Sequence, residues 1–208
     1  MFFLLVFTPF IEDLPQGDLI EAALLTLVMV SSVLAIGGRP RTLLVALILL
    51  VPALVGKWVN HLRPDVLHPA IFLIGAIIFF SFVVMHLLQF IVRAPRVDAE
   101  VLCGGIAGFL MLGILWIPVY VLVARLNPAA FTVPAGTTLD GFNAFYFSFV
   151  TLCTVGYGDV TPVSRVARTL AVIEAITGLF YMAVLISRLV SMYSSVKPAE
   201  EKDNAGED

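Results

Sequence analysis

The chain has 208 residues, of which 60% are hydrophobic and only 13% are charged, and its mean hydropathy is +1.03. Because a soluble domain usually carries about 25% charged residues, this composition excludes an ordinary soluble protein and indicates an integral membrane protein. The net charge of −3 is too small to favour a nucleic-acid partner.

Apolar runs along the chain are candidates to cross a membrane as helices, which takes about 20 apolar residues each. We predict five crossings, at residues 19–36, 42–59, 70–92, 101–124 and 166–190. The apolar segment 2–11 is too short to cross, and we expect it to lie in the interface or to enter the bilayer partway.

The segment between the last two crossings has a different character. It opens with "NPAAFTVPAGTT", whose Pro, Gly and Thr residues predict an exposed loop. Asp140 is then a suitable N-cap for a short aromatic helix that ends near Cys153 and is too short to cross. The stretch "TLCTVGYGDVTP" follows before the chain returns to the surface. Irregular backbone at membrane depth is tolerated only if buried in protein or lining water, so we predict a re-entrant loop beside a water-filled path.

Nine residues of this loop, Thr151 to Asp159, resemble the selectivity filter of potassium channels. They follow that family's T-x-x-T-x-G-Y-G-D pattern without a gap, behind a short aromatic helix and between two apolar runs. The resemblance covers about half the chain, residues 98–196, and residues 1–95 carry no comparable signature. It implies a potassium-selective channel that conducts K+ passively, with K+ as the permeant ligand and no cofactor.

The resemblance also implies a role for each filter residue. Gly156 and Gly158 can adopt positive φ at little steric cost, which lets successive carbonyls point to one axis and replace the water around K+. The Thr154 hydroxyl is expected to add one more oxygen at the inner end. K+ is expected at Thr154, Val155, Gly156 and Tyr157, and the ion-binding segment ends at Gly158.

Side chains around the filter are expected to support it. Val155 and Tyr157 should point away from the axis, and Tyr157 should pack on Tyr146 and Phe147. Thr151 is a further filter support.

Asp159 follows the filter directly. Repeated by symmetry, it would form a ring of carboxylates that attracts cations to the outer mouth, and the alternative is a simple turn or cap residue.

The fifth run resembles the inner helix of the same family. Gly178 is either a hinge that opens the inner mouth or a site of close helix packing. Helical spacing places a set of apolar residues on one face, which we expect to form the cavity wall and gate, the alternative being a lipid or packing face: Leu179, Met182, Ile186 and Val190.

Glu174 is the one acid well inside a crossing. It is expected to form a hydrogen bond to the pore helix or filter scaffold, or to be a pH-sensitive element, and the alternative is a buried, protonated carboxyl satisfied by a neighbouring helix.

The predicted fold is an all-α membrane protein with five transmembrane helices per chain and a re-entrant pore helix and filter loop between the last two. One chain carries one such loop, whereas the family uses four copies, so a closed homotetramer is expected. The predicted regions are an N-terminal transmembrane region at 1–95, a pore domain at 96–195 and a short acidic cytoplasmic tail at 196–208.

We expect a multi-pass protein of a plasma or bacterial inner membrane, with the N-terminus outside, the C-terminus in the cytoplasm and membrane lipid around it. Seven of the 12 basic residues would then lie inside, in keeping with the positive-inside rule: Arg39, Arg41, Arg93, Arg96, Arg188, Lys197 and Lys202. No run carries the arginine ladder of a voltage sensor, and the short tail argues against a fused cytosolic ligand-binding domain.

Several other functions remain open. Val150 stands where some relatives carry an acid, and Cys153 where a threonine is common, so a weakly selective monovalent cation channel is one alternative. A non-conducting regulatory or scaffold subunit is another. A secondary transporter would show paired broken helices, and an enzyme would show a nucleophile–base or metal constellation. Neither pattern is present in the sequence.

Overall fold

The computed structural model describes residues 17–35, 40–62, 68–94 and 99–203. The apolar segment 2–11 lies outside these residues. The helices are α2 (Gly17–Ala35), α3 (Pro40–Leu62), α4 (Pro69–Arg93), α5 (Ala99–Leu126), α6 (Gly141–Leu152) and α7 (Arg165–Asp203). Two short strands are β1 (Phe131–Thr132) and β2 (Thr161–Pro162).

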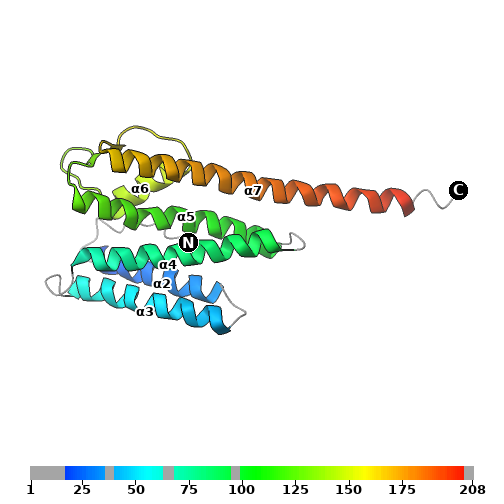
Figure 1. Ribbon diagram of the computed structural model, residues 1–208, viewed down its shortest axis with the longest axis horizontal. Coiled ribbons are helices and arrows are strands. Elements are labelled where there is room, and N and C mark those ends of the chain that lie inside the picture. The colour runs from blue at the N-terminus through cyan, green and yellow to red at the C-terminus, as the bar shows by residue number, and fades with distance from the viewer. Residues whose placement is uncertain (1–16, 36–39, 63–67, 95–98, 204–208) are drawn as a thin grey trace.

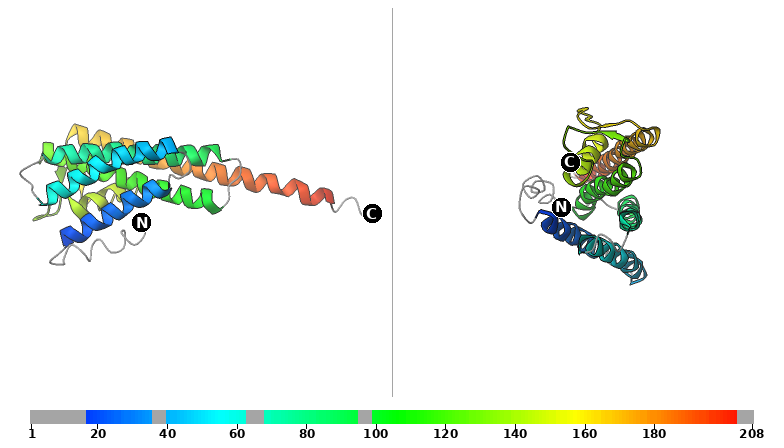
Figure 2. Two further views of the ribbon diagram at one scale, coloured as in Figure 1. Left: turned by 90° about the horizontal axis from the view of Figure 1, so that it is seen from below. Right: turned by 90° about the vertical axis from the view of Figure 1, so that its left-hand side faces the viewer.

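The long helices run antiparallel, so that the chain passes from one end of the bundle to the other (Figure 1). We call the end where α5 stops and α7 starts the filter end, and the end where α4 stops and α5 starts the opposite end. α5 and α7 lie side by side, and short α6 contacts both of them at the filter end. α4 packs on α5, α3 on α4 and α2 on α3. In the end view of Figure 2, α2 and α3 lie on the side of α4 and α5 that is away from α6 and α7.

Within the described residues, four helices are long and apolar enough to cross a membrane: Arg41–Val59, Pro69–Arg93, Ala99–Leu126 and Arg165–Arg188. They coincide with four of the five predicted crossings. The first predicted crossing is also helical, as α2, but its apolar part within the described residues, Ala22–Val33, is shorter than the usual span. Its passage through the membrane therefore stays a prediction.

Glycines on α5 let α7 approach closely. A Cβ added to Gly105 would come within 2.6 Å of Leu185 Cδ1, and one added to Gly108 within 2.3 Å of Tyr181 Oη. The Tyr181 hydroxyl also donates a hydrogen bond to the Gly105 carbonyl, at 2.7 Å. Small residues thus allow tight contact between membrane helices here, as is common in bilayers. One face of α7 is buried, through Ala167, Glu174, Gly178, Tyr181 and Leu185.

Polar contacts attach the N-terminal helices to the pore half of the chain. Ser32 Oγ on α2 lies 3.4 Å from Met111 Sδ on α5. At the opposite end, the Arg188 guanidinium on α7 donates to the carbonyls of Ile91, at 3.2 Å, and Ala94. These carbonyls lie at the C-terminus of α4, where backbone acceptors lack helical partners and a cation is favoured.

The predicted exposed loop after α5 is only partly exposed. Ala130 and Phe131 are buried, because Phe131 packs its ring on Tyr120 and Phe147. β1 pairs antiparallel with β2, with Phe131 opposite Pro162. The prediction was wrong at these residues because two apolar residues inside a polar segment can still join a core formed by distant helices.

Candidate functional site

α6 starts where the sequence predicts, with Asp140 as its N-cap. The Asp140 side chain makes no capping bond to the helix. Its Oδ1 accepts a hydrogen bond from Thr138 Oγ1 instead, at 2.7 Å. The Asp140 backbone is extended, with φ −142° and ψ 178°. Asp140 therefore marks the start of the helix by its backbone conformation, and its side chain does not cap the helix.

Two glycines, one on α5 and one on α7, allow α6 to pack closely between these helices. A Cβ at Gly113 of α5 would lie 2.6 Å from the Phe149 ring, and a Cβ at Gly178 of α7 would lie 2.4 Å from the Leu152 carbonyl oxygen. α7 is one continuous helix through Gly178. Of the two roles expected for Gly178, close packing therefore has direct structural support.

The backbone after α6 alternates in hand. Thr154 (φ 56°), Gly156 (φ 56°) and Gly158 (φ 85°) are left-handed, and the residues between them are not. The amides of Thr154 and Val155 donate back to α6, to the carbonyls of Thr151 and Val150, both at 2.9 Å.

The Gly156 amide also reaches the Val150 carbonyl, at 3.4 Å. Among the described residues, the carbonyls of 154–158 accept no backbone hydrogen bond. The first amides of the segment are thus tied to the helix, and its carbonyls stay available for a ligand.

The left-handed Thr154 was missed from the sequence, which predicted positive φ at the two glycines only. Cys153 is the C-cap of α6, so Thr154 occupies the next position, where helices commonly end in a left-handed residue. The usual residue at that position is glycine, and a threonine does not indicate a left-handed backbone. The position of Thr154 just after the helix end indicates positive φ, whereas its residue type does not.

The two aromatic supports proposed for Tyr157 lie in different places. Tyr146 stacks on Tyr157 as predicted, with ring centroids 6.4 Å apart and an interplanar angle of 7°. Phe147 is buried, and its ring packs on Tyr120 at 4.8 Å and Phe131 at 5.6 Å. Adjacent residues on a helix point about 100° apart, so both rings cannot face the filter. The prediction for Phe147 was wrong in its partner.

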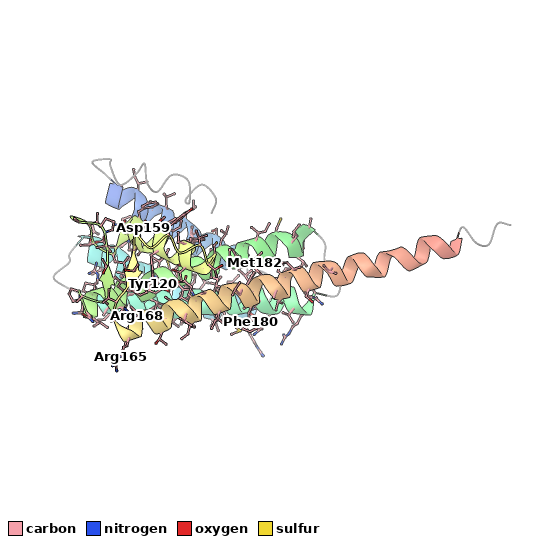
Figure 3. All side chains as sticks on the ribbon, turned by 90° about the horizontal axis from the view of Figure 1, so that it is seen from above. Tyr120, Asp159, Arg165, Arg168, Phe180 and Met182 are labelled. Atoms are coloured by element: carbon pink, nitrogen blue, oxygen red, sulfur yellow. The ribbon has the colours of Figure 1, made fainter. Side chains whose placement is uncertain are left out.

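Side chains of the filter segment are largely exposed in the single chain. Val155 is 52% exposed and Tyr157 is 73% exposed, and the side chain of Thr151 is half-buried. The expected gate residues Leu179, Met182 and Ile186, together with Val190, are exposed as well. Met182 and Phe180 lie on different sides of α7 in Figure 3.

Asp159 is exposed at the filter end. Its carboxylate accepts a hydrogen bond from the Tyr146 hydroxyl, the main cause that lowers the pKa of Asp159 below its ordinary value. Backbone amides of Val160 and of Asp159 itself contribute in the same direction. The side chain is therefore both accessible and held in its ionised form.

Glu174 is fully buried and bonds to both α6 and α5, so these bonds do not separate the two interpretations given for it above. Ser148 Oγ lies 2.7 Å from Glu174 Oε1, and the Tyr120 hydroxyl bonds to Oε2. In the described part of the chain, no group of His, Cys, Asp or Glu could hold a metal ion.

Comparison with known proteins agrees with this geometry. Residues 109–195 match the family model described as "Ion channel". The two pore potassium channel c of Oryza sativa subsp. japonica is 41% identical over 64 residues, which cover 31% of this chain and 14% of that protein. The inward rectifier potassium channel Kirbac3.1 of Paramagnetospirillum magnetotacticum is 36% identical over 52 residues, which cover 25% of this chain and 18% of that protein.

The matched segment is short relative to the proteins that it resembles. A voltage-gated potassium channel of Aeropyrum pernix is 28% identical over 67 residues, 32% of this chain and 23% of that protein, so the chain spans well under half of these relatives. No solved structure gives a significant match. The matched residues nonetheless contain α6, the alternating backbone and most of α7. Residues 109–195 are therefore similar to the ion channel family, and the part of the chain related to potassium channels is the part that forms α6, the filter segment and most of α7.

Proposed function

We propose that this protein is a potassium-selective channel that conducts K+ passively through the segment Thr154–Gly158. The observation that carries the proposal is the alternation of left-handed dihedrals at Thr154, Gly156 and Gly158 behind a short, tightly seated helix. Such a backbone can aim successive carbonyls at one axis, where they replace the hydration shell of K+. The carbonyls of Thr154, Val155, Gly156 and Tyr157, with the Thr154 hydroxyl, would be the ion ligands.

A homotetramer would complete the filter. One chain supplies one strand of carbonyls, and a closed ring requires several copies around an axis. The half-exposed Val155 and largely exposed Tyr157 support this assembly, since a neighbouring copy could cover both. The exposed apolar face of α7 would line the cavity and gate, through Leu179, Met182, Ile186 and Val190.

We propose that the filter end faces the outside of a plasma or bacterial inner membrane. The alternating course of the helices supports five crossings, with α2 starting at the filter end and α7 leaving at the opposite end (Figure 1). Arg93 and Arg188 lie toward the opposite end, which suits a cytoplasmic side. The N-terminal region 1–95 would brace the pore domain 96–195, and the acidic tail 196–208 would be cytoplasmic.

Ion flux in liposomes tests the proposal directly. Purified protein in vesicles is expected to carry a K+ flux and no measurable Na+ flux under equal gradients, because the carbonyl ring matches dehydrated K+. Equal fluxes would favour the weakly selective cation channel and contradict the proposal. A folded tetramer with no flux of either ion would favour the non-conducting subunit, and would contradict it as well.

Asp159→Asn is expected to lower single-channel K+ conductance at low ionic strength, because the exposed carboxylate concentrates cations at the outer mouth. The difference from wild type should shrink at high salt, where surface charges are screened. The lowered pKa of Asp159 keeps the carboxylate ionised on acidification, so wild-type conductance should hold between about pH 7 and about pH 5. Recording in planar bilayers measures both effects.

Asp140→Asn is the matched control, because Asp140 is an exposed acid near the start of α6 with no capping bond to lose. It should leave conductance unchanged at every salt concentration. Equal reductions by both variants would mean that general surface charge acts, and no reduction by Asp159→Asn would refute its role at the mouth.

A further inference from the structure

Glu174 joins the three helices of the pore domain at one buried point. It lies on α7 and bonds to Tyr120 of α5 and Ser148 of α6, and all three residues are 0% exposed. Figure 3 places Tyr120 among the packed side chains of the filter end. The Tyr120 ring is fixed there by contacts with Trp116, at 5.8 Å, and Phe147, at 4.8 Å. Its hydroxyl therefore has little freedom to find another acceptor.

Counting protons in this cluster indicates the state of Glu174. Ser148 Oγ lies 2.8 Å from the Gly113 carbonyl and 2.7 Å from Glu174 Oε1. Ser148 is placed as the donor to both oxygens, but it has a single proton and the Gly113 carbonyl can only accept. A protonated Glu174 relieves this competition, because it can donate to Ser148 Oγ while Ser148 donates to Gly113. Tyr120 donates to the other carboxyl oxygen. A neutral Glu174 gives each contact its own proton, whereas an ionised one leaves two acceptors competing for the Ser148 proton.

The surroundings of Glu174 also disfavour a charge. The titratable groups that interact with it from the neighbouring elements are Tyr120 of α5 and Cys153 at the end of α6. In the described part of the chain, no Lys or Arg acts on the carboxyl. A buried carboxylate without a cation is strongly disfavoured, and more so in a membrane helix.

The cluster is linked to the filter through α6. Ser148 lies two residues before Val150, whose carbonyl receives the amides of Val155 and Gly156. A shift of α6 at Ser148 would therefore carry the anchor of the filter with it. A helix backbone is rigid over so short a distance, since its hydrogen bonds close every turn.

We propose that Glu174 is a neutral carboxylic acid that holds α6 against α5 and α7, and thereby positions the filter. It is a positioning residue, since it touches the pore helix and not the permeant ion. The selectivity part of this proposal rests on the proposed potassium conduction, but the protonation of Glu174 does not. Ionisation at alkaline pH would remove one hydrogen bond of the cluster and loosen the seat of α6, with a loss of selectivity.

Infrared spectroscopy of the reconstituted full chain tests the protonation without any need for conduction. The wild type at neutral pH is expected to show the carbonyl stretch of a protonated carboxylic acid, and this band should disappear in Glu174→Gln and persist in Glu100→Gln. Glu100 is an exposed acid in the first turn of α5, so it serves as the matched control. A wild type that lacks the band would overturn the proposal.

Ion selectivity tests the positioning role. Glu174→Gln can accept from Tyr120 and donate to Ser148, so it should keep the wild-type K+/Na+ permeability ratio and keep it at alkaline pH, where the wild type loses selectivity. Glu174→Ala leaves buried partners unsatisfied and should lower the ratio by about tenfold. Where Glu174→Ala fails to assemble, Ser148→Ala, which deletes one arm only, should show a smaller loss.

The outcomes separate this proposal from the proposed function. An infrared band in a wild type that carries no K+ would refute conduction but leave the neutral Glu174 standing. Wild-type selectivity in both Glu174→Ala and Ser148→Ala would overturn the positioning role. An identical pH profile in the wild type and Glu174→Gln would overturn the effect of ionisation.

Discussion

Gly156→Ala is expected to abolish selective K+ flux while the helices stay folded. Gly156 has φ 56°, and a Cβ added there would have no atom within 4 Å in the chain, so the cost is backbone strain and not a clash. A left-handed alanine costs about 1–2 kcal/mol, and relaxing it turns the neighbouring carbonyls out of the alternating pattern. In a tetramer this strain is repeated in each copy. Vesicle flux assays and circular dichroism measure the two parts of the expectation.

Gly136→Ala provides the control for the strain itself. Gly136 has φ 83° and also has no atom within 4 Å of an added Cβ, but it lies in the loop between β1 and α6 and outside the segment Thr154–Gly158. It should lose a similar amount of stability and keep its K+ flux. Selective flux through Gly156→Ala would contradict the proposed filter, and loss of flux in both variants would trace the defect to stability alone.

The helices could be predicted because each depends mainly on a local property. α3, α4, α5 and α7 each contain about 20 apolar residues in a row, and a bilayer forces such a segment into a helix whatever surrounds it. The positive φ of Gly156 and Gly158 was likewise a property of the residue type. The pore helix was predicted from its cap position and its short length, and its observed bounds are within one residue of the prediction.

The parts that could not be predicted depend on contacts between distant residues. Tyr120 meets Glu174 across 54 positions, and Arg188 reaches Ala94 across 94. No periodicity within either helix identifies such a partner. The burial of Phe131 could not be predicted for the same reason, since the rings that cover it come from α5 and α6. Local sequence patterns thus predict the helices themselves, whereas the way the helices pack on one another is known only from the structure.

Gly178→Ala is expected to displace the pore helix and weaken the assembled protein. The added Cβ would lie 2.4 Å from the Leu152 carbonyl oxygen and 3.0 Å from Leu152 Cδ1. The first contact is with backbone, which cannot rotate away as a side chain can, so α6 and α7 must separate. Overpacking of this kind costs about 1–3 kcal/mol per chain, against a gain of about 1 kcal/mol in helix propensity. The measurements are survival of the proposed tetramer in denaturant and K+ flux, and both should fall.

Gly75→Ala separates this effect from helix stiffening. Gly75 lies within α4, and its added Cβ would make only an ordinary contact with Ala53, at 3.8 Å. It should match or exceed wild-type stability, because alanine favours the helix and nothing must move. If Gly178 were a hinge, a different result would be expected: Gly178→Ala would assemble as well as Gly75→Ala, and its channel would only open less often. Since the Leu152 carbonyl, in the last turn of α6, lies directly against Gly178 of α7, we expect assembly to suffer first, and the loss of flux to follow from it.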